Sequence, residues 1–406
     1  MSEGSIFASK VKGLYKKLCQ DEWNAYTAGI LIALFSILIM AWMRPWGAVG
    51  AIRNWGEWIL YGIGYYEDAP RNWLEASGSV IGVGFVAGAF LSACLGNNLA
   101  LRIPPRLEML KGVLAGIFMG VGAALAGGCN VGGMYNAIGN LAANGFSMWL
   151  GLVIGVLIGL KYLYWEMEHI SWGSGGAKTF EFPVGLQAVL GIIALIGLGW
   201  GAYHYAGSDD DYVAKMSGIL LIAAALGYTM QRGRWCMVQA FREPHMTGDS
   251  TLARSVALSI ALLAVGILVL KYTGLRLPAH YVRGTFGWGS IAGGLLFGIG
   301  AMLAGGCGSG TLWRVGEGQI KLWIVVPFFG ISNALLVDWI RENEWEGMGA
   351  WLDDGITDAG KLGSFVYLPD TFLGYGGTLI MILVVMAAWY LIVDWNEDTN
   401  KLTLEM

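Results

Sequence analysis

The 406-residue chain has few charges, few histidines and no paired cysteines. Only 13% of its residues are charged and the formal net charge is −4, whereas soluble domains carry about 25% charged residues. No basic surface is available for nucleic acid, so no nucleic-acid partner is expected. The four histidines and five cysteines show no metal-ligand spacing and no CxxC pair. We therefore predict no metal, no cofactor and no disulfide framework.

Apolar residues dominate the remainder of the sequence. Hydrophobic residues make up 56% of the chain, with 63 glycines, 19 tryptophans and 17 tyrosines. Small residues allow close helix packing in lipid, and tryptophan and tyrosine are typical of the two membrane interfaces. The polar stretches between apolar runs are short. This composition predicts one integral domain within the lipid bilayer.

Ten apolar runs are long enough, or nearly so, to cross a bilayer as helices. They lie at 23–42, 76–97, 111–128, 146–164, 183–204, 216–231, 254–271, 289–306, 322–338 and 371–393. We therefore expect an all-α integral membrane protein. Segment 48–65 mixes tryptophan with charge and is expected to be an interfacial helix. The expected organisation is an amphipathic N-terminal lead-in at 1–22, a transmembrane domain at 23–394 and a tail at 395–406.

Loop charges predict the orientation. Lysines in the lead-in and arginines in the loops around 102–111 and 232–254 favour the cytoplasmic side, whereas the acidic stretches 209–211 and 338–358 favour the other side. With ten crossings, both termini are then cytoplasmic. The basic loop 271–283 would lie outside, against the rule.

The stretch Leu-Ala-Gly-Gly-Cys occurs twice, at Leu125–Cys129 and Leu303–Cys307. Each copy ends an apolar helix and opens a polar segment, at 130–140 and 308–319, that is too short to cross. We expect these segments to be re-entrant half-helices, which are allowed only where the backbone is buried or lines a path. The glycines that let the backbone break are Gly127, Gly128, Gly305 and Gly306.

The crossing count places the two breaks on opposite faces. One copy follows the third crossing and the other follows the eighth, so the half-helices enter from opposite sides. This is the pattern of inverted repeats, in which interrupted helices meet near the midplane and form the site. The expected halves are about 76–164 and 216–338.

Each repeated cysteine lies at the start of a half-helix, where free N–H groups and the helix dipole favour an anion. Cys129 and Cys307 are therefore interpreted as thiols that face an anion or a sulfur-bearing ligand. Buried cysteine otherwise acts as a small hydrophobe, but equivalent placement in both halves favours the functional interpretation. Asn130, next to Cys129, is a candidate hydrogen-bond donor along the path.

Three arginines are accessory candidates. Arg232 and Arg234 precede Cys236 at the inner end of a crossing. They would either attract an anion near the cytoplasmic mouth or anchor the helix on the positive side. Arg314 and Glu317 are three residues apart in the second half-helix, and we expect them to neutralise each other.

These motifs carry a family resemblance. The sequence resembles the YeeE/YedE family of sulfur-transport membrane proteins over about 75–394, and its signature stretches are Gln231–Cys236, Ala240–Arg242, Leu303–Gly310, Arg314–Gly318 and Leu125–Asn130. The resemblance implies thiosulfate uptake through a narrow conduit in a bacterial inner membrane. The thiols that would hand the anion along are Cys236, Cys307 and Cys129, whereas Cys19 and Cys94 match no functional cysteine. A small TusA-like cytoplasmic sulfur carrier is an implied partner.

Two departures from the family pattern leave the substrate open. The half with the Gln-Arg-Gly-Arg-x-Cys motif comes second, an order that resembles the YedE branch, which is associated with selenium metabolism. Trp235 stands where Phe is usual and Ala240 where Gly is usual. The alternatives are transport of a selenium compound such as selenite, or a membrane sulfurtransferase acting through a cysteine persulfide. No base or resolving thiol lies beside the cysteines in sequence, so a transporter and not an enzyme is predicted. The duplicated thiol break argues against a purely structural subunit.

Overall fold

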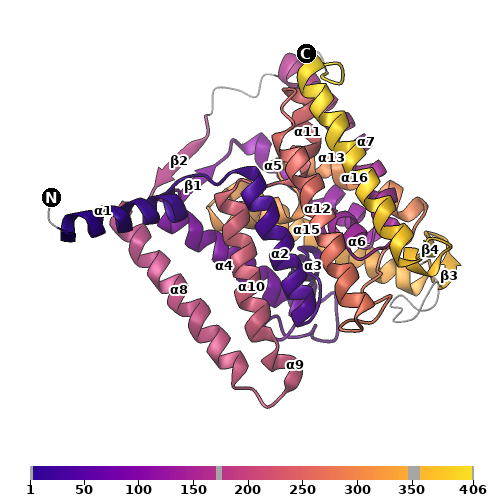
Figure 1. The fold of residues 1–406 in the computed structure, drawn as a ribbon, viewed down its shortest axis with the longest axis horizontal. Coiled ribbons are helices and arrows are strands. Elements are labelled where there is room, and N and C mark those ends of the chain that lie inside the picture. Colours follow the sequence, from indigo (N-terminus) through magenta and orange to yellow (C-terminus); the bar gives the residue numbers. More distant parts are fainter. Residues whose placement is uncertain (1–2, 171–175, 346–356, 405–406) are drawn as a thin grey trace.

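The computed structural model describes residues 3–170, 176–345 and 357–404, which form a bundle of long helices around shorter ones (Figure 1). The helices are α1 (Glu3–Tyr15), α2 (Ala25–Trp42), α3 (Val49–Gly62), α4 (Ser77–Leu95), α5 (Arg106–Leu125), α6 (Asn136–Gly139), α7 (Asn144–His169), α8 (Val184–Ala206), α9 (Asp211–Ala214), α10 (Met216–Arg232), α11 (Met237–Met246), α12 (Thr251–Tyr272), α13 (Trp288–Ala304), α14 (Gly308–Gly316), α15 (Ile320–Glu342) and α16 (Gly374–Thr399). Single π-helical turns lie at Lys16–Gln20 and Asn130–Tyr135, and a 3-10 turn lies at Leu368–Asp370.

Strands are few and short. β1 (Ala100–Ile103) pairs antiparallel with β2 (Lys178–Glu181), and β3 (Thr357–Gly360) pairs antiparallel with β4 (Gly363–Phe365). The first pair joins the segment after α4 to the segment before α8. Both sheets have only two short strands and connect loops, so the fold is all-α.

Ten helical spans within the described ranges are long and apolar enough to cross a membrane. Each of the ten predicted runs coincides with one of them, so the predicted all-α membrane fold is confirmed. α2 shows the local reason, because it contains no charged residue and begins after Asn24, whose side chain accepts a hydrogen bond from the Tyr26 N–H at 2.8 Å. α7 continues to His169 and α16 to Thr399, which lies inside the predicted tail.

Small residues allow the central helices to pack closely. α4 packs against α10, and their backbones touch at two glycines. A Cβ added to Gly88 would lie 1.9 Å from the Ala224 carbonyl oxygen, and one added to Gly227 would lie 1.9 Å from that of Phe85. Only glycine permits this approach, which brings the end of α4 and the end of α10 to one level.

The order of elements repeats along the chain. A long helix, a break, a short helix, two long helices, a second break, a short helix and a long helix occur from α2 to α7 and again from α10 to α15. The packing repeats too, because α2 contacts α12 as α10 contacts α4, and α5 contacts α15 as α13 contacts α7. The correspondence extends beyond the expected ranges 76–164 and 216–338.

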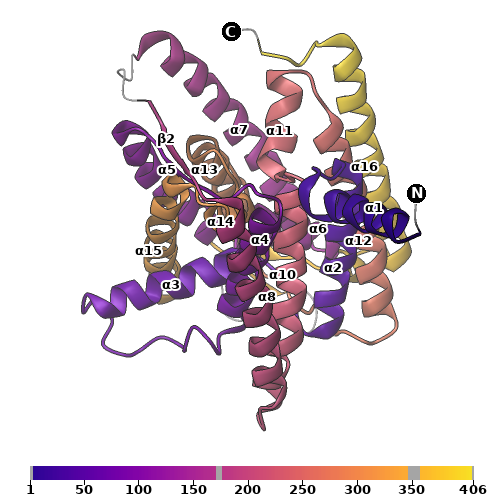
Figure 2. The ribbon, with the colours of Figure 1, turned by 90° about the vertical axis from the view of Figure 1, so that its left-hand side faces the viewer.

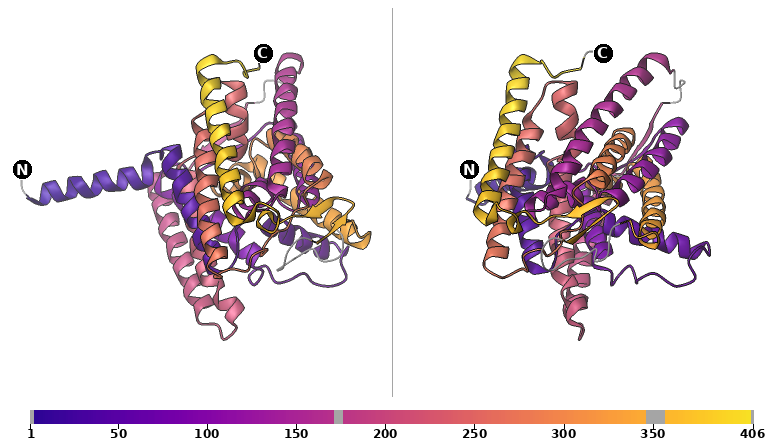
Figure 3. Two further views of the ribbon diagram at one scale, coloured as in Figure 1. Left: turned by 45° about the vertical axis from the view of Figure 1, so that its right-hand side comes forward. Right: turned by 90° about the vertical axis from the view of Figure 1, so that its right-hand side faces the viewer.

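Three elements lie at the edge of the bundle. α8, which links the two series, lies on the outside of the bundle (Figure 1), where it packs against α4 and α10. α3 lies crosswise to α8 and α10 (Figure 2) and packs against α15 and α4 with Ala51, Ile52 and Leu60 buried. The interfacial position expected at 48–65 stays a prediction. α1 projects sideways (Figure 3), and its exposed side chains Phe7, Val11 and Leu14 recur every three or four residues. That pattern is typical of a helix lying on a membrane surface.

Candidate functional site

The two Leu-Ala-Gly-Gly-Cys stretches adopt the same backbone conformation. Gly127 and Gly305 are left-handed, with φ of +68° and +78°, so each break needs a glycine at this position. Cys129 and Cys307 follow in extended conformations, with φ and ψ of −73° and 179° and of −75° and −176°. Each cysteine carbonyl accepts a hydrogen bond from the N–H four residues later at 2.6 Å. The predicted short helices after both breaks are confirmed.

A third helix break, between α10 and α11, places the thiol of Cys236 next to the thiol of Cys307. Cys236 lies at the N-cap of α11, after Arg234 with a left-handed φ of +50°. The Cys236 thiol donates to Cys307 Sγ across 3.6 Å, and Cys307 Sγ also accepts from the Gly310 N–H at 3.3 Å. Both cysteines are fully buried. The short helices α11 and α14 therefore present their N-termini to a common point.

Cys129 lies on the other side of the first turn of α14. A Cβ added to Gly308 would lie 3.1 Å from Cys129 Sγ, whereas one added to Gly310 would lie 3.0 Å from Cys236 Sγ and 3.2 Å from Cys307 Sγ. Residues two apart point to opposite sides of a helix. The glycine-rich turn therefore separates Cys129 from the Cys236–Cys307 pair by little more than one backbone.

Polar side chains on the short helices remain without partners. Asn130 accepts from the Gly308 N–H at 3.3 Å through Oδ1, but its Nδ2 has no hydrogen-bond partner among the described residues. The same holds for Thr311 Oγ1 and Trp313 Nε1, and all three side chains are buried. These three groups are buried polar atoms that are available to hydrogen-bond a polar group in the interior.

Arginines surround the approach to Cys129. Two adjoining cavities meet at Gly127, and one of them reaches Cys129. We call them the arginine cavity, after the four arginines that line them, which are Arg44, Arg53, Arg283 and Arg341. Burial, followed by the nearby Arg44 and Arg53, lowers the pKa of Arg283 well below its ordinary value. Such a cavity attracts an anion.

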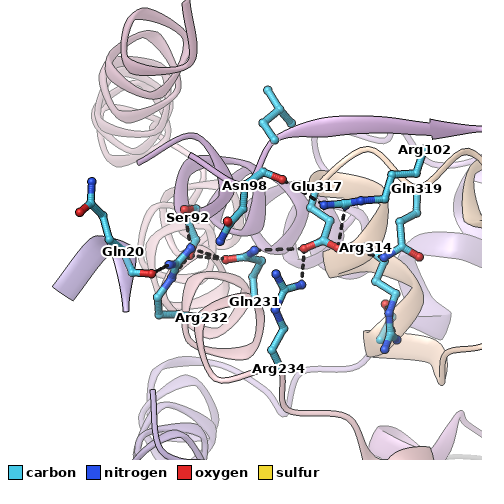
Figure 4. Close-up of polar contacts among 12 residues, drawn as sticks. Gln20, Ser92, Asn98, Arg102, Gln231, Arg232, Arg234, Arg314, Glu317 and Gln319 are labelled. Atoms are coloured by element: carbon cyan, nitrogen blue, oxygen red, sulfur yellow. Dashed lines mark hydrogen bonds and ion pairs between the residues drawn. The ribbon is translucent and has the colours of Figure 1, made fainter. Parts of the chain in front are cut away.

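A different set of charges surrounds Glu317 (Figure 4). Glu317 forms ion pairs with Arg234 at 2.5 Å and with Arg102 at 3.1 Å. The expected pairing of Arg314 with Glu317 is therefore wrong, because Arg102 and Arg234 reach the carboxylate from other elements. Arg314 instead stacks on Trp313, 4.3 Å from the ring centroid, and its Nη1 lies 3.9 Å from Cys236 Sγ.

Arg232 and Arg234 have separate surroundings despite their spacing. Arg232 is buried and donates to the Gln20 carbonyl at 2.9 Å and the Ser92 carbonyl at 3.0 Å, so it fixes the N-terminal segment and α4 to α10. Arg234 is about one-third exposed. Of the two candidates, Arg234 is the more exposed, and its charge faces Glu317.

The predicted thiols and their neighbours thus come together. Cys129, Cys236, Cys307 and Asn130 all lie around the first turn of α14, whereas Cys94 lies in a separate apolar cluster. Sequence reasoning missed the arginines of the cavity and the role of Arg102. One usable signal was Arg44-Pro45-Trp46-Gly47, a Pro/Gly interruption between α2 and α3 like the break between α10 and α11.

The sequence matches a known protein family and is similar to several transporters. A family described as sulphur transport matches residues 3–158 and 232–405, which include all three clustered cysteines. A probable transporter YedE from Escherichia coli (strain K12) is 27% identical over 384 residues, 87% of each chain. The thiosulfate transporter TsuA of the same organism is 30% identical over 183 residues, 45% of this chain and 48% of that one. TsuA of Spirochaeta thermophila is 36% identical over 117 residues, 28% of this chain and 34% of that one.

Proposed function

The chain belongs to the sulphur transport family, the YeeE/YedE family, and from that premise we propose that it takes up thiosulfate or a closely related sulfur-containing anion. Its relatives include transporters named for thiosulfate, and a sulfur-anion transporter is the general function that they support. The observation that carries the proposal is the buried cluster of thiols at helix breaks. Cys236 and Cys307 lie 3.6 Å apart, and Cys129 lies on the opposite side of the first turn of α14.

The proposed route runs through this cluster. The arginine cavity attracts the dianion, which meets Cys129 and the Nδ2 group of Asn130 and then passes the glycine turn of α14 to Cys307 and Cys236. A thiol is a weak donor that suits a soft terminal sulfur better than a hard oxygen. Successive weak sites allow release as well as binding. Arg314 supplies one cation beside the last thiol.

The charge pattern gives the route a direction. We infer that the series α2–α7 and α10–α15 are two halves of opposite orientation, because α2 is the first of the ten spans and α10 belongs to the sixth, with four spans between them. With both termini cytoplasmic in a bacterial inner membrane, the arginine cavity opens outward and Glu317 lies on the inner side. The TusA-like carrier implied by the family would receive sulfur at that inner side.

One contact favours a second candidate function. Two thiols in van der Waals contact are what a sulfurtransferase needs, since Cys236 and Cys307 could serve as acceptor and resolving thiol. In that reaction a thiol takes the terminal sulfur of thiosulfate, the S–S bond of thiosulfate breaks, sulfite leaves and a cysteine persulfide carrying the proton remains. A selenium compound such as selenite is the other substrate alternative.

Uptake into proteoliposomes tests these alternatives. Purified protein should carry labelled thiosulfate, and excess sulfate should compete far less than unlabelled thiosulfate, because strongly hydrated sulfate gains few strong donors in exchange for water. Equal competition by sulfate would contradict the role of the thiols. Preference for labelled selenite would favour the selenium alternative. Release of sulfite, with a persulfide detected by mass spectrometry, would favour the sulfurtransferase.

A further inference from the structure

Glu317 has every acceptor position of its carboxylate filled. Oε1 accepts from Arg102 Nη1 at 3.1 Å and Gln319 Nε2 at 2.9 Å, and Oε2 accepts from Arg234 Nη1 at 2.5 Å and Gln231 Nε2 at 3.1 Å (Figure 4). A carboxylate has about four lone-pair positions. The donors come from β1, from the end of α10 and from the segment after α14. The network is therefore a complete anion site that the chain fills with its own carboxylate.

The arginines of this site remain accessible although the carboxylate does not. The Glu317 side chain is 2% exposed, whereas Arg102 and Arg234 are 36% and 35% exposed. An anion arriving from elsewhere can therefore reach both guanidinium groups without entering the space of Glu317. Guanidinium groups bind carboxylates and other oxyanions by the same charge-assisted hydrogen bonds.

The site is also continuous with the thiol cluster. Trp313 lies beside both Arg314 and Arg234, whose guanidinium carbons are 4.3 Å and 5.4 Å from its ring centroid. Arg314 reaches Cys236 Sγ. An anion that leaves Cys236 therefore has Arg314 on one side and Arg234 next along the same ring. The left-handed backbone of Arg234, unusual for arginine, directs its side chain to this place.

The arginine cavity at the other end is built differently. Arg44 donates to Ser77 Oγ at 2.7 Å and to the carbonyl of Pro45, which are neutral partners. Its positive charge is thus not cancelled by these contacts. At the inner end, Glu317 offsets the charge of Arg102 and Arg234 directly. Of the other cavity arginines, Arg53 pairs with Glu57 at 3.0 Å. The two ends of the proposed route therefore differ in that one buried carboxylate at the inner end pairs with two arginines at once.

We propose that Glu317 is a tethered counter-anion that keeps the inner end of the route weakly binding. The inference rests on the proposed function. The transported anion must compete with Glu317 for Arg234, so the arginines attract it without retaining it. Without the carboxylate, Arg102 and Arg234 would form a two-arginine site that holds a dianion and slows its release. Glu317 therefore acts through Arg102 and Arg234, and it lowers the affinity of these two arginines for the transported anion.

Two isosteric Glu→Gln variants and one arginine variant test the proposal. Binding is measured by titration calorimetry with sodium thiosulfate, with sodium selenite in parallel, and transport is measured by uptake into proteoliposomes. Glu317→Gln should lower Kd about tenfold, the effect of one charge-assisted hydrogen bond, and should reduce the maximal uptake rate. Arg102→Gln should raise Kd, because Glu317 then holds Arg234 alone. Glu108→Gln is the matched control, since Glu108 also pairs with two cations, Lys111 and Lys321, outside this site; its Kd should equal that of the native protein.

The outcomes separate the possibilities. If Glu317 only holds the segment after α14, Glu317→Gln leaves Kd unchanged or raises it, and the inference is overturned. If Glu317→Gln does not fold, Arg102→Gln decides, because an unchanged or lower Kd in that variant also overturns it. If the native protein neither binds nor transports either anion, the proposed function fails, which is a result distinct from either of these.

Discussion

At the scale of single residues, equivalent cysteines have different surroundings. Cys307 Sγ caps α14 by accepting from the Gly310 N–H, and it also receives the Cys236 thiol. Cys129 makes no such cap and instead lines the arginine cavity. In the route we propose, the Cys129 thiol is therefore the one that donates to an anion from the arginine cavity, whereas Cys307 Sγ already accepts two hydrogen bonds.

We predict that the sulfur of Cys307 matters beyond its cap. Cys307→Ser keeps an acceptor for the Gly310 N–H, so stability should fall by no more than about 1 kcal/mol, yet thiosulfate uptake should drop to background because the soft sulfur is gone. Cys129→Ala should also abolish uptake. Cys94→Ala is the control, since Cys94 is buried away from the cluster. Native uptake by Cys307→Ser would show that the thiol only caps the helix. Thermal unfolding in detergent gives the stability.

At the scale of elements, the breaks between helices position the N-termini of the short helices that carry the cysteines. The three long helices before the breaks, α5, α10 and α13, each end within two residues of a left-handed residue, at Gly127, Arg234 and Gly305. The short helix that follows is then free to point its N-terminus into the interior. Packing differs around the two glycines, because a Cβ at Gly127 would lie 2.6 Å from the Arg283 carbonyl oxygen, whereas a Cβ at Gly305 would meet nothing within 4 Å.

This difference gives a paired prediction. Gly305→Ala should cost only the left-handed strain of about 1–2 kcal/mol and should retain much of the uptake. Gly127→Ala should cost more and should stop uptake, because the methyl group displaces the segment at Arg283 that lines the arginine cavity. Parallel measurement of melting temperature and uptake distinguishes the two. Equal losses in both variants would mean that strain alone, and not the contact with Arg283, explains the effect.

At the scale of the whole molecule, ten spans carry two series of elements with the same order and the same packing partners. The first element of one series, α2, contacts the third of the other, α12, and α10 contacts α4 in return. Reciprocal contacts of this kind are expected of halves related by an axis in the membrane plane. They would bring the two breaks together from opposite faces.

Thiol labelling in intact cells tests this arrangement. With Cys19 replaced by alanine and the other native cysteines buried, an engineered thiol at Asp210 should react with an impermeant maleimide from outside. Thiols at Arg106 and Thr247 should react only after the cells are opened, because an even number of crossings separates these two loops and an odd number separates each from Asp210. Labelling of Asp210→Cys and Thr247→Cys from the same side would contradict opposed halves.

The sequence by itself determined the membrane fold, the ten spans, and the two Gly-Gly-Cys breaks with their short helices, because hydrophobic length and glycine conformation act over neighbouring residues. Only the tertiary structure decided which groups meet. Cys236 contacts Cys307 across 71 positions of sequence, and the arginine cavity collects residues from distant loops. Local spacing favoured an Arg314–Glu317 pair, but helix packing brought Arg102 and Arg234 to the buried carboxylate. Arg314 was thereby left to face Trp313 and the Cys236 thiol, since a fully coordinated carboxylate has no acceptor position remaining.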